Sequence, residues 1–135
     1  MKLTSSFVLA SAFGLVLGVP VVAHHSFAAQ YDREKPVTLV GPVTKIDWIN
    51  PHARFFVDVK DANGKVVNWE VELAAPAMLM RRGWTRSSLK LGESVTVNAY
   101  LAKDGSNLAN ASTVILVDGR KVFAGSSGDA GNTPP

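Results

Sequence analysis

Apolar and polar residues alternate along several short segments of this chain, and this pattern limits the fold more than any other feature. Alternation with a period of two is typical of strands that are buried on one face. The segments are also rich in β-branched residues, which favour strands. The expected strands are residues 36–48, 53–60, 65–73, 94–102 and 110–117, with a short last strand or extended segment at 120–123.

Turn and helix signals set the order in which these strands are joined. The turn at 61–64 contains Asn63–Gly64 and predicts a hairpin between the second and third strands. Gly41–Pro42 interrupts the first strand and predicts a bend. Between the third and fourth strands, Pro76 can begin a short helix and Gly83 can end it.

Three strands, one helix and two further strands is the element order of the OB-fold, a five-stranded Greek-key barrel. A small β-sandwich would share the same strand predictions. The helix between strands 3 and 4 and the bend in the first strand favour the barrel. We therefore predict an all-β domain with a small helical content and an OB-like topology.

The N-terminus has the features of a cleavable export signal. Lys2 is followed by an apolar run at residues 7–22. For cleavage after Ala23, the small residues Val21 and Ala23 stand at positions −3 and −1. The run contains glycine and proline and is shorter than the ~20 apolar residues that usually span a bilayer. We expect a signal peptide at 1–23 and a periplasmic or secreted product without a membrane span, rather than a retained anchor.

Removal of 23 of the 135 residues leaves 112, which is enough for one domain with a single core. We place that domain at 24–123 and expect a disordered, Gly- and Ser-rich tail at 124–135. The chain has no cysteine, so its core must be stable without disulfides. With Lys2 removed, 13 basic residues face 11 acidic ones, and this near-balance gives little support to a nucleic-acid or anionic-membrane partner.

Three histidines, His24, His25 and His52, are the candidate metal ligands. Cleavage after Ala23 would make His24 the first residue, and its α-amine and imidazole Nδ1 could then chelate one metal ion. His52 could supply a third nitrogen from a loop that Pro51 stiffens, and His25 is a further candidate. A nitrogen set of this kind suits Cu(II), which accepts tetragonal geometry and binds most strongly among the divalent first-row metals.

Other interpretations of these histidines remain open. Histidines next to a cleavage site can simply be solvated, and a single loop histidine is more often a hydrogen-bonding group than a ligand. Cleavage after Ala28 is also acceptable and would remove both terminal histidines. The carboxylates of Asp32, Glu34 and Asp47 could add a ligand or accept hydrogen bonds from one, and the sequence does not choose between them.

Glu70 and Glu72 lie two apart on one strand, a spacing that can pair carboxylates for acid–base chemistry. Such residues usually form a solvated sheet face, so we expect no catalysis there. Met78 and Met80 could bind copper(I) if they were exposed, but methionines in a short helix are more often part of the core.

Arginines 81, 82 and 86 surround Trp84, a pattern that on an OB-type barrel can indicate a site for single-stranded nucleic acid. The export signal argues against that role. Trp84 follows the glycine that ends the helix, so we expect its ring to close one end of the barrel. The chain has no cysteine or serine nucleophile arrangement and no glycine-rich phosphate loop.

The HHSF segment at 24–27 and the W-x-N-P-H element at 48–52 hold all three histidines. In these elements above all, the chain resembles a family of small exported bacterial proteins known as a domain of unknown function. At 52–54 this chain has His-Ala-Arg where His-x-His is commoner, which costs one candidate ligand. The resemblance implies export and a β-rich domain and transfers no activity. It extends over residues 24–32, 43–61, 68–73, 81–97 and 102–114.

These features together predict a periplasmic module that binds or delivers a transition metal, copper above others, through His24, His25 and His52. A metal ion is the expected partner, with another periplasmic protein as a second candidate. One alternative is a metal-free module that binds a ligand or a protein. Another is a monocopper oxidoreductase, which would need an open coordination position beside a substrate surface.

The position of the mature N-terminus tests this hypothesis first. N-terminal sequencing or intact mass of the exported protein should give His24 as residue one, since the small residues before it fit the signal peptidase. A mature chain that begins at Ala29 would remove two of the three histidines and contradict the predicted metal site.

Overall fold

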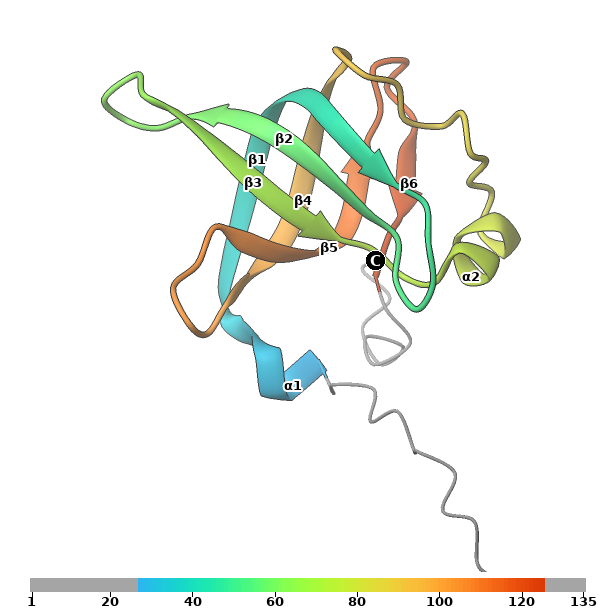
Figure 1. Ribbon diagram of the computed structural model, residues 1–135, viewed down its shortest axis with the longest axis horizontal. Helices are drawn as coiled ribbons and strands as arrows, with labels where there is room; N and C mark the ends of the chain where they lie inside the picture. The colour runs from blue at the N-terminus through green and yellow to red at the C-terminus, as the bar shows by residue number, and fades with distance from the viewer. Residues whose placement is uncertain (1–26, 126–135) are drawn as a thin grey trace, which may run out of the picture.

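Residues 27–125, which the computed structural model describes, form six strands and two short helices (Figure 1). The predicted signal peptide at 1–23 and most of the predicted C-terminal tail lie outside these residues. In chain order the elements are α1 (Phe27–Gln30), β1 (Tyr31–Asp47), β2 (Arg54–Lys60), β3 (Val66–Glu72), α2 (Pro76–Arg81), β4 (Ser94–Ala102), β5 (Leu108–Ile115) and β6 (Lys121–Phe123).

Five of these strands close into a barrel. β1 pairs antiparallel with both β2 and β4, β2 pairs with β3, and β4 pairs with β5. A parallel pairing of β3 with the start of β5 closes the circle, and β6 pairs with the end of β5, on the edge opposite β4. The cyclic order β1-β2-β3-β5-β4, with α2 between β3 and β4, is that of the OB-fold. The predicted all-β fold with a small helical content is confirmed.

The predicted bend in β1 lies where the strand changes partners. The stretch up to Pro42 pairs with β4, and the stretch from Val43 onward pairs with β2. A Cβ atom placed on Gly41 would lie 1.8 Å from the backbone oxygen of Asp58, on β2. Because glycine has no Cβ, the backbones of β1 and β2 can approach this closely.

The inward-facing residues of the strands build one apolar core. Phe55, Val57 and Val71 are fully buried, as their alternation predicted. Trp84 is only 2% exposed, its ring lies 6.4 Å from that of Trp48, and its Nε1–H donates a 2.7 Å hydrogen bond to the backbone oxygen of Phe123. Trp84 is therefore buried, as expected of a residue whose ring closes one end of the barrel.

Residues 27–35 differ from the expected polar lead-in. They form α1 and the first part of β1, because Phe27 and Tyr31 are buried against a second apolar cluster outside the barrel that includes Ala102. At the other end, the chain continues past β6 to Ala124, whose N–H donates to Ser112 and whose carbonyl accepts from Ala74. No helix within residues 27–125 is long and apolar enough to cross a membrane.

The substitution Gly41→Ala should destabilise the barrel. Replacing glycine by alanine ordinarily gains a few tenths of a kcal/mol through the unfolded state. Here the added methyl group meets a backbone atom that cannot rotate away, so we expect the free energy of unfolding to fall by about 1–3 kcal/mol. Urea unfolding followed by circular dichroism measures this change.

The neighbouring Val40 provides the control, because its side chain is 52% exposed. The β-branched replacement Val40→Thr should change the free energy of unfolding by less than about 0.5 kcal/mol. Equal stability of the Gly41→Ala variant and the wild type would show that the close approach of β1 to β2 is not needed.

Candidate functional site

His52 lies in the loop between β1 and β2, directly after the cis peptide bond Asn50–Pro51. Its neighbour Ala53 is held in place by backbone hydrogen bonds with Leu73 and Ala74. The His52 side chain is 23% exposed, and its Nδ1 lies 3.0 Å from Oε1 of Glu72. The imidazole is therefore oriented by a carboxylate at the end of β3.

Three neighbouring side chains hold the Glu72 carboxylate. Besides His52, Asn110 Nδ2 donates a 3.4 Å hydrogen bond to Oε1, and Arg54 Nη2 lies 3.7 Å from Oε2. Arg54 also donates a 2.7 Å hydrogen bond to Glu70. Glu72 itself is only 5% exposed. A buried carboxylate needs such partners, because burial of a charge without them is costly.

Tyr31 covers the same carboxylate from the start of β1. Its ring is 2% exposed, and burial, followed by the negative charge of Glu72, raises its pKa well above the ordinary value of a phenol. The Tyr31 side chain therefore stays neutral at physiological pH. Its hydroxyl lies near Glu72 but makes no hydrogen bond of good geometry to the described residues, and the same is true of Asn110 Oδ1.

The N-terminal segment packs over this part of the barrel surface. The Phe27 ring lies 5.5 Å from that of Tyr31 and 5.7 Å from that of Tyr100 on β4. Lys103, in the turn after β4, donates through its backbone N–H to Gln30 and through Nζ to the carbonyl of Ala28. These contacts attach α1 to the barrel beside Tyr31.

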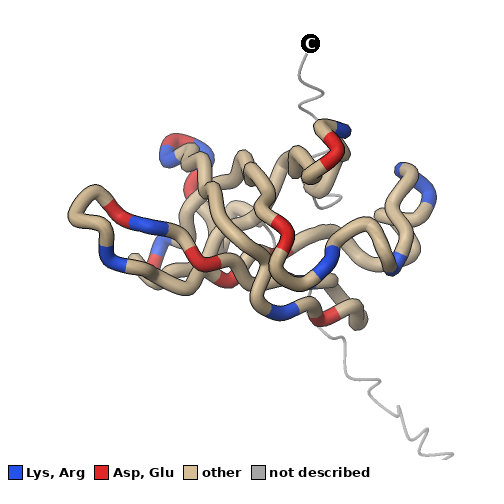
Figure 2. The backbone as a smooth tube through the Cα atoms, turned by 90° about the horizontal axis from the view of Figure 1, so that it is seen from above, with Lys and Arg blue, Asp and Glu red and all other residues tan. Residues whose placement is uncertain are grey.

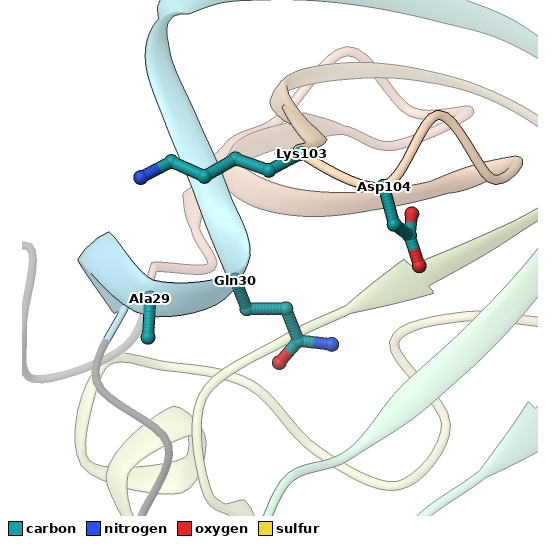
Figure 3. A pocket seen from close by; sticks show the side chains of 4 residues that line it. All are labelled: Ala29, Gln30, Lys103 and Asp104. Atoms are coloured by element: carbon teal, nitrogen blue, oxygen red, sulfur yellow. The ribbon is translucent and has the colours of Figure 1, made fainter.

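A hollow of about 320 Å³ lies next to this attachment, lined by Ala29, Gln30, Lys103 and Asp104 (Figure 3). The Lys103 side chain extends toward α1, whereas Asp104 accepts hydrogen bonds from the backbone N–H and the hydroxyl of Ser106 in its own turn. Among residues 27–125, the lining has one carboxylate, that of Asp104, and no histidine.

Glu70 and Glu72 were both expected on a solvated sheet face, and this expectation is wrong for Glu72. Alternation does direct both side chains away from the barrel interior, opposite to Val71. Tyr31 and Asn110 then cover Glu72 from outside, while Glu70 keeps 30% of its side chain exposed. The periodicity of a sequence predicts on which face of a strand a side chain lies. It does not predict whether residues from another segment will cover that face.

The structure describes His52 but not the other two predicted ligands, because His24 and His25 lie outside residues 27–125. Within that range no group of three or more His, Cys, Asp or Glu side chains is placed to hold a metal ion. The described part of the predicted histidine set is thus His52 alone, and Glu72, which was not predicted to belong to the site, orients its ring.

Two of the three other carboxylates considered as ligands have different local roles. Asp32 accepts a 3.0 Å hydrogen bond from the backbone N–H of Glu34. Asp47 forms a 2.6 Å ion pair with Lys45 on the same strand. Neither arrangement points to a shared metal site.

The predicted basic cluster is exposed around a buried aromatic residue. The arginines at 81, 82 and 86 are solvent-exposed, whereas Trp84 belongs to the core. Met78 packs against the core as expected of a core methionine, but Met80 is 52% exposed. A buried tryptophan offers no stacking surface for a nucleic-acid base.

Comparison with known proteins places the chain in a family. The family of unknown function DUF6152 matches residues 14–111, which is more than half of the chain and includes the three histidines. Searches of curated proteins and of solved structures give no significant match. The resemblance seen in the HHSF and W-x-N-P-H elements is confirmed, and the chain belongs to the DUF6152 family of unknown function.

Proposed function

We propose that this protein is an exported module that binds Cu(II) in the periplasm and holds or delivers it. The proposed ligands are the α-amine and imidazole of His24, the imidazole of His52 and, as a further candidate, His25. The observation that carries the proposal is the 3.0 Å contact between Nδ1 of His52 and the buried Glu72 carboxylate.

This contact selects the tautomer of His52 that a metal site needs. When a carboxylate accepts the hydrogen on Nδ1, the lone pair of the neutral imidazole is on Nε2. Metal-binding histidines commonly donate their other ring N–H to a carboxylate, which fixes the orientation of the ring and strengthens the ligand. Glu72 is well placed for this role because Arg54 and Asn110 hold it in turn.

The packing of the N-terminal segment supports the choice of His24 as a partner ligand. Phe27 is anchored next to Tyr31, and Tyr31 lies beside the carboxylate that orients His52. His24 lies three positions before Phe27 in the chain, a length that spans at most about 11 Å when extended. A mature N-terminus at His24 would thus begin within a short distance of this region.

The donor set explains the choice of metal. An α-amine and two imidazoles are nitrogen donors of the kind that Cu(II) prefers, whereas Mg²⁺ and Ca²⁺ require oxygen ligands. The chain has no cysteine, so thiolate sites for zinc or iron–sulfur clusters are excluded. A module that only holds or delivers copper needs no substrate pocket beside the metal, in contrast to a monocopper oxidoreductase.

Titration of the exported protein with Cu(II) tests the ligands. We expect His52→Ala to lower the affinity by about 100-fold, because loss of a ligand should cost at least as much as loss of an orienting group. One extra residue before His24 should lower it similarly, because the α-amine is then moved out of the chelate ring. Isothermal titration calorimetry and Cu(II) EPR measure both effects.

Equal affinity in the wild type and in both variants would leave only adventitious copper binding and refute the proposal. Tight binding combined with oxidase or peroxidase turnover would replace the carrier role with the oxidoreductase. Absence of tight binding would favour the metal-free binding module.

The Glu72 carboxylate, which contacts His52 Nδ1, provides a second, independent test of the proposed copper site. The substitution Glu72→Gln keeps the shape of the side chain but removes the charge that orients and strengthens the imidazole. We expect Cu(II) affinity to fall by about tenfold, with a change in the EPR parameters of the bound metal.

Glu70→Gln is the matched control, since Glu70 lies on the same strand and pairs with Arg54 but not with His52. Its Cu(II) affinity should stay close to that of the wild type. Both variants are compared at a temperature where circular dichroism shows a folded barrel. A folded Glu72→Gln variant with unchanged affinity and spectrum would contradict the role assigned to Glu72.

A further inference from the structure

Three arginines gather at the end of the molecule that carries α2. Arg81 ends the helix, Arg82 caps it, and Arg86 follows in the next loop. All three are exposed, and no ion pair among the described residues involves them. The guanidinium of Arg82 lies 3.9 Å from the centre of the Phe123 ring.

These three arginines equal the excess of basic over acidic residues in the sequence. The formal net charge is +3, with 14 basic and 11 acidic residues, so without these three arginines the basic and acidic residues are equal in number. Residues 73–92 contain no Asp or Glu, and neither does the loop at 48–53. Figure 2 shows basic positions and no acidic ones at the end that carries α2. Within residues 27–125, the end that carries α2 is thus locally cationic.

Two large apolar side chains are exposed on the segments at this end of the molecule. Met80 is 52% exposed on α2, and Ile49 is 60% exposed on the loop between β1 and β2. Figure 1 shows this loop lying next to α2, and the contact between Trp48 and Trp84 links the two. We define these five residues, Ile49, Met80, Arg81, Arg82 and Arg86, as the α2 surface.

We propose that the α2 surface docks the protein onto an anionic phospholipid bilayer. Arginines attract acidic headgroups, each basic residue near the surface contributing about 1 kcal/mol. Exposed apolar side chains can enter the region between headgroups and acyl chains. Nucleic acid fits less well, because Trp84 is buried and leaves no aromatic platform for bases. This inference does not depend on copper binding.

Vesicle binding tests the proposal. The exported protein should bind vesicles of phosphatidylcholine with 30% phosphatidylglycerol more tightly than vesicles of phosphatidylcholine alone, and added salt should weaken binding. The double variant Arg81→Gln, Arg86→Gln should lose roughly 30-fold in affinity. The double variant Ile49→Ser, Met80→Ser should lose about tenfold or more, since a purely electrostatic contact would be insensitive to it. Co-sedimentation measures all of these affinities.

Lys60 and Lys65 provide the matched charge control, because they are exposed at the β2–β3 hairpin, far from α2 in Figure 1. Their joint replacement by Gln should change vesicle affinity less than about threefold, and any contribution of the N-terminal residues is the same in every variant. Equal losses in the lysine and arginine variants would overturn the proposal, as would equal binding to both vesicle types. Binding to poly-L-glutamate through the same arginines without binding to vesicles would overturn it in favour of an acidic polypeptide partner.

Discussion

The parallel pairing of β3 with β5 is the constraint on which both the barrel and the candidate site depend. It joins the last residues of β3, Glu70 to Glu72, to the first residues of β5. Without this contact the sheet would remain open, with β3 as an unpaired edge. The pairing also sets Glu72 opposite Asn110. The same pairing therefore closes the barrel and brings the side chains of Glu72 and Asn110 together.

Burial of the Glu72 charge in turn explains how its neighbours are arranged. A carboxylate that is 5% exposed must be compensated by hydrogen bonds and opposite charge. Arg54 stands opposite it in the register of β2 with β3, and His52 reaches it from the loop before β2. The orientation of His52 is thus a consequence of a buried charge, and not only of the proline before it.

The sequence predicted those features of the fold that local patterns encode. The alternation of apolar and polar residues predicted the strands, and Gly41–Pro42 predicted the bend in β1. Pro76 and Gly83 predicted α2 close to its observed bounds. It did not predict the burial of Glu72, which arises because segments distant in the chain cover one strand.

The early start of β1 was missed for a related reason. Phe27 and Tyr31 are only two aromatic residues in a polar stretch, and their partners Tyr100 and Leu108 lie some 70 residues away in sequence. Of the candidate site, the sequence identified His52 from its position after Pro51. The carboxylate that orients it could be found only from the pairing of β2, β3 and β5.

The loop between β1 and β2 connects the two proposals, because it carries Ile49 of the α2 surface and, three residues later, His52. Ala53 at its end is hydrogen-bonded to Ala74, just before α2, and Trp48 at its start packs against Trp84 just after that helix. A loop held at both ends moves as part of the barrel, so a bilayer bound at the α2 surface would lie at a set distance from His52. Copper held there would then be presented close to the membrane face, where a membrane-bound partner could receive it without a change in the fold of the barrel.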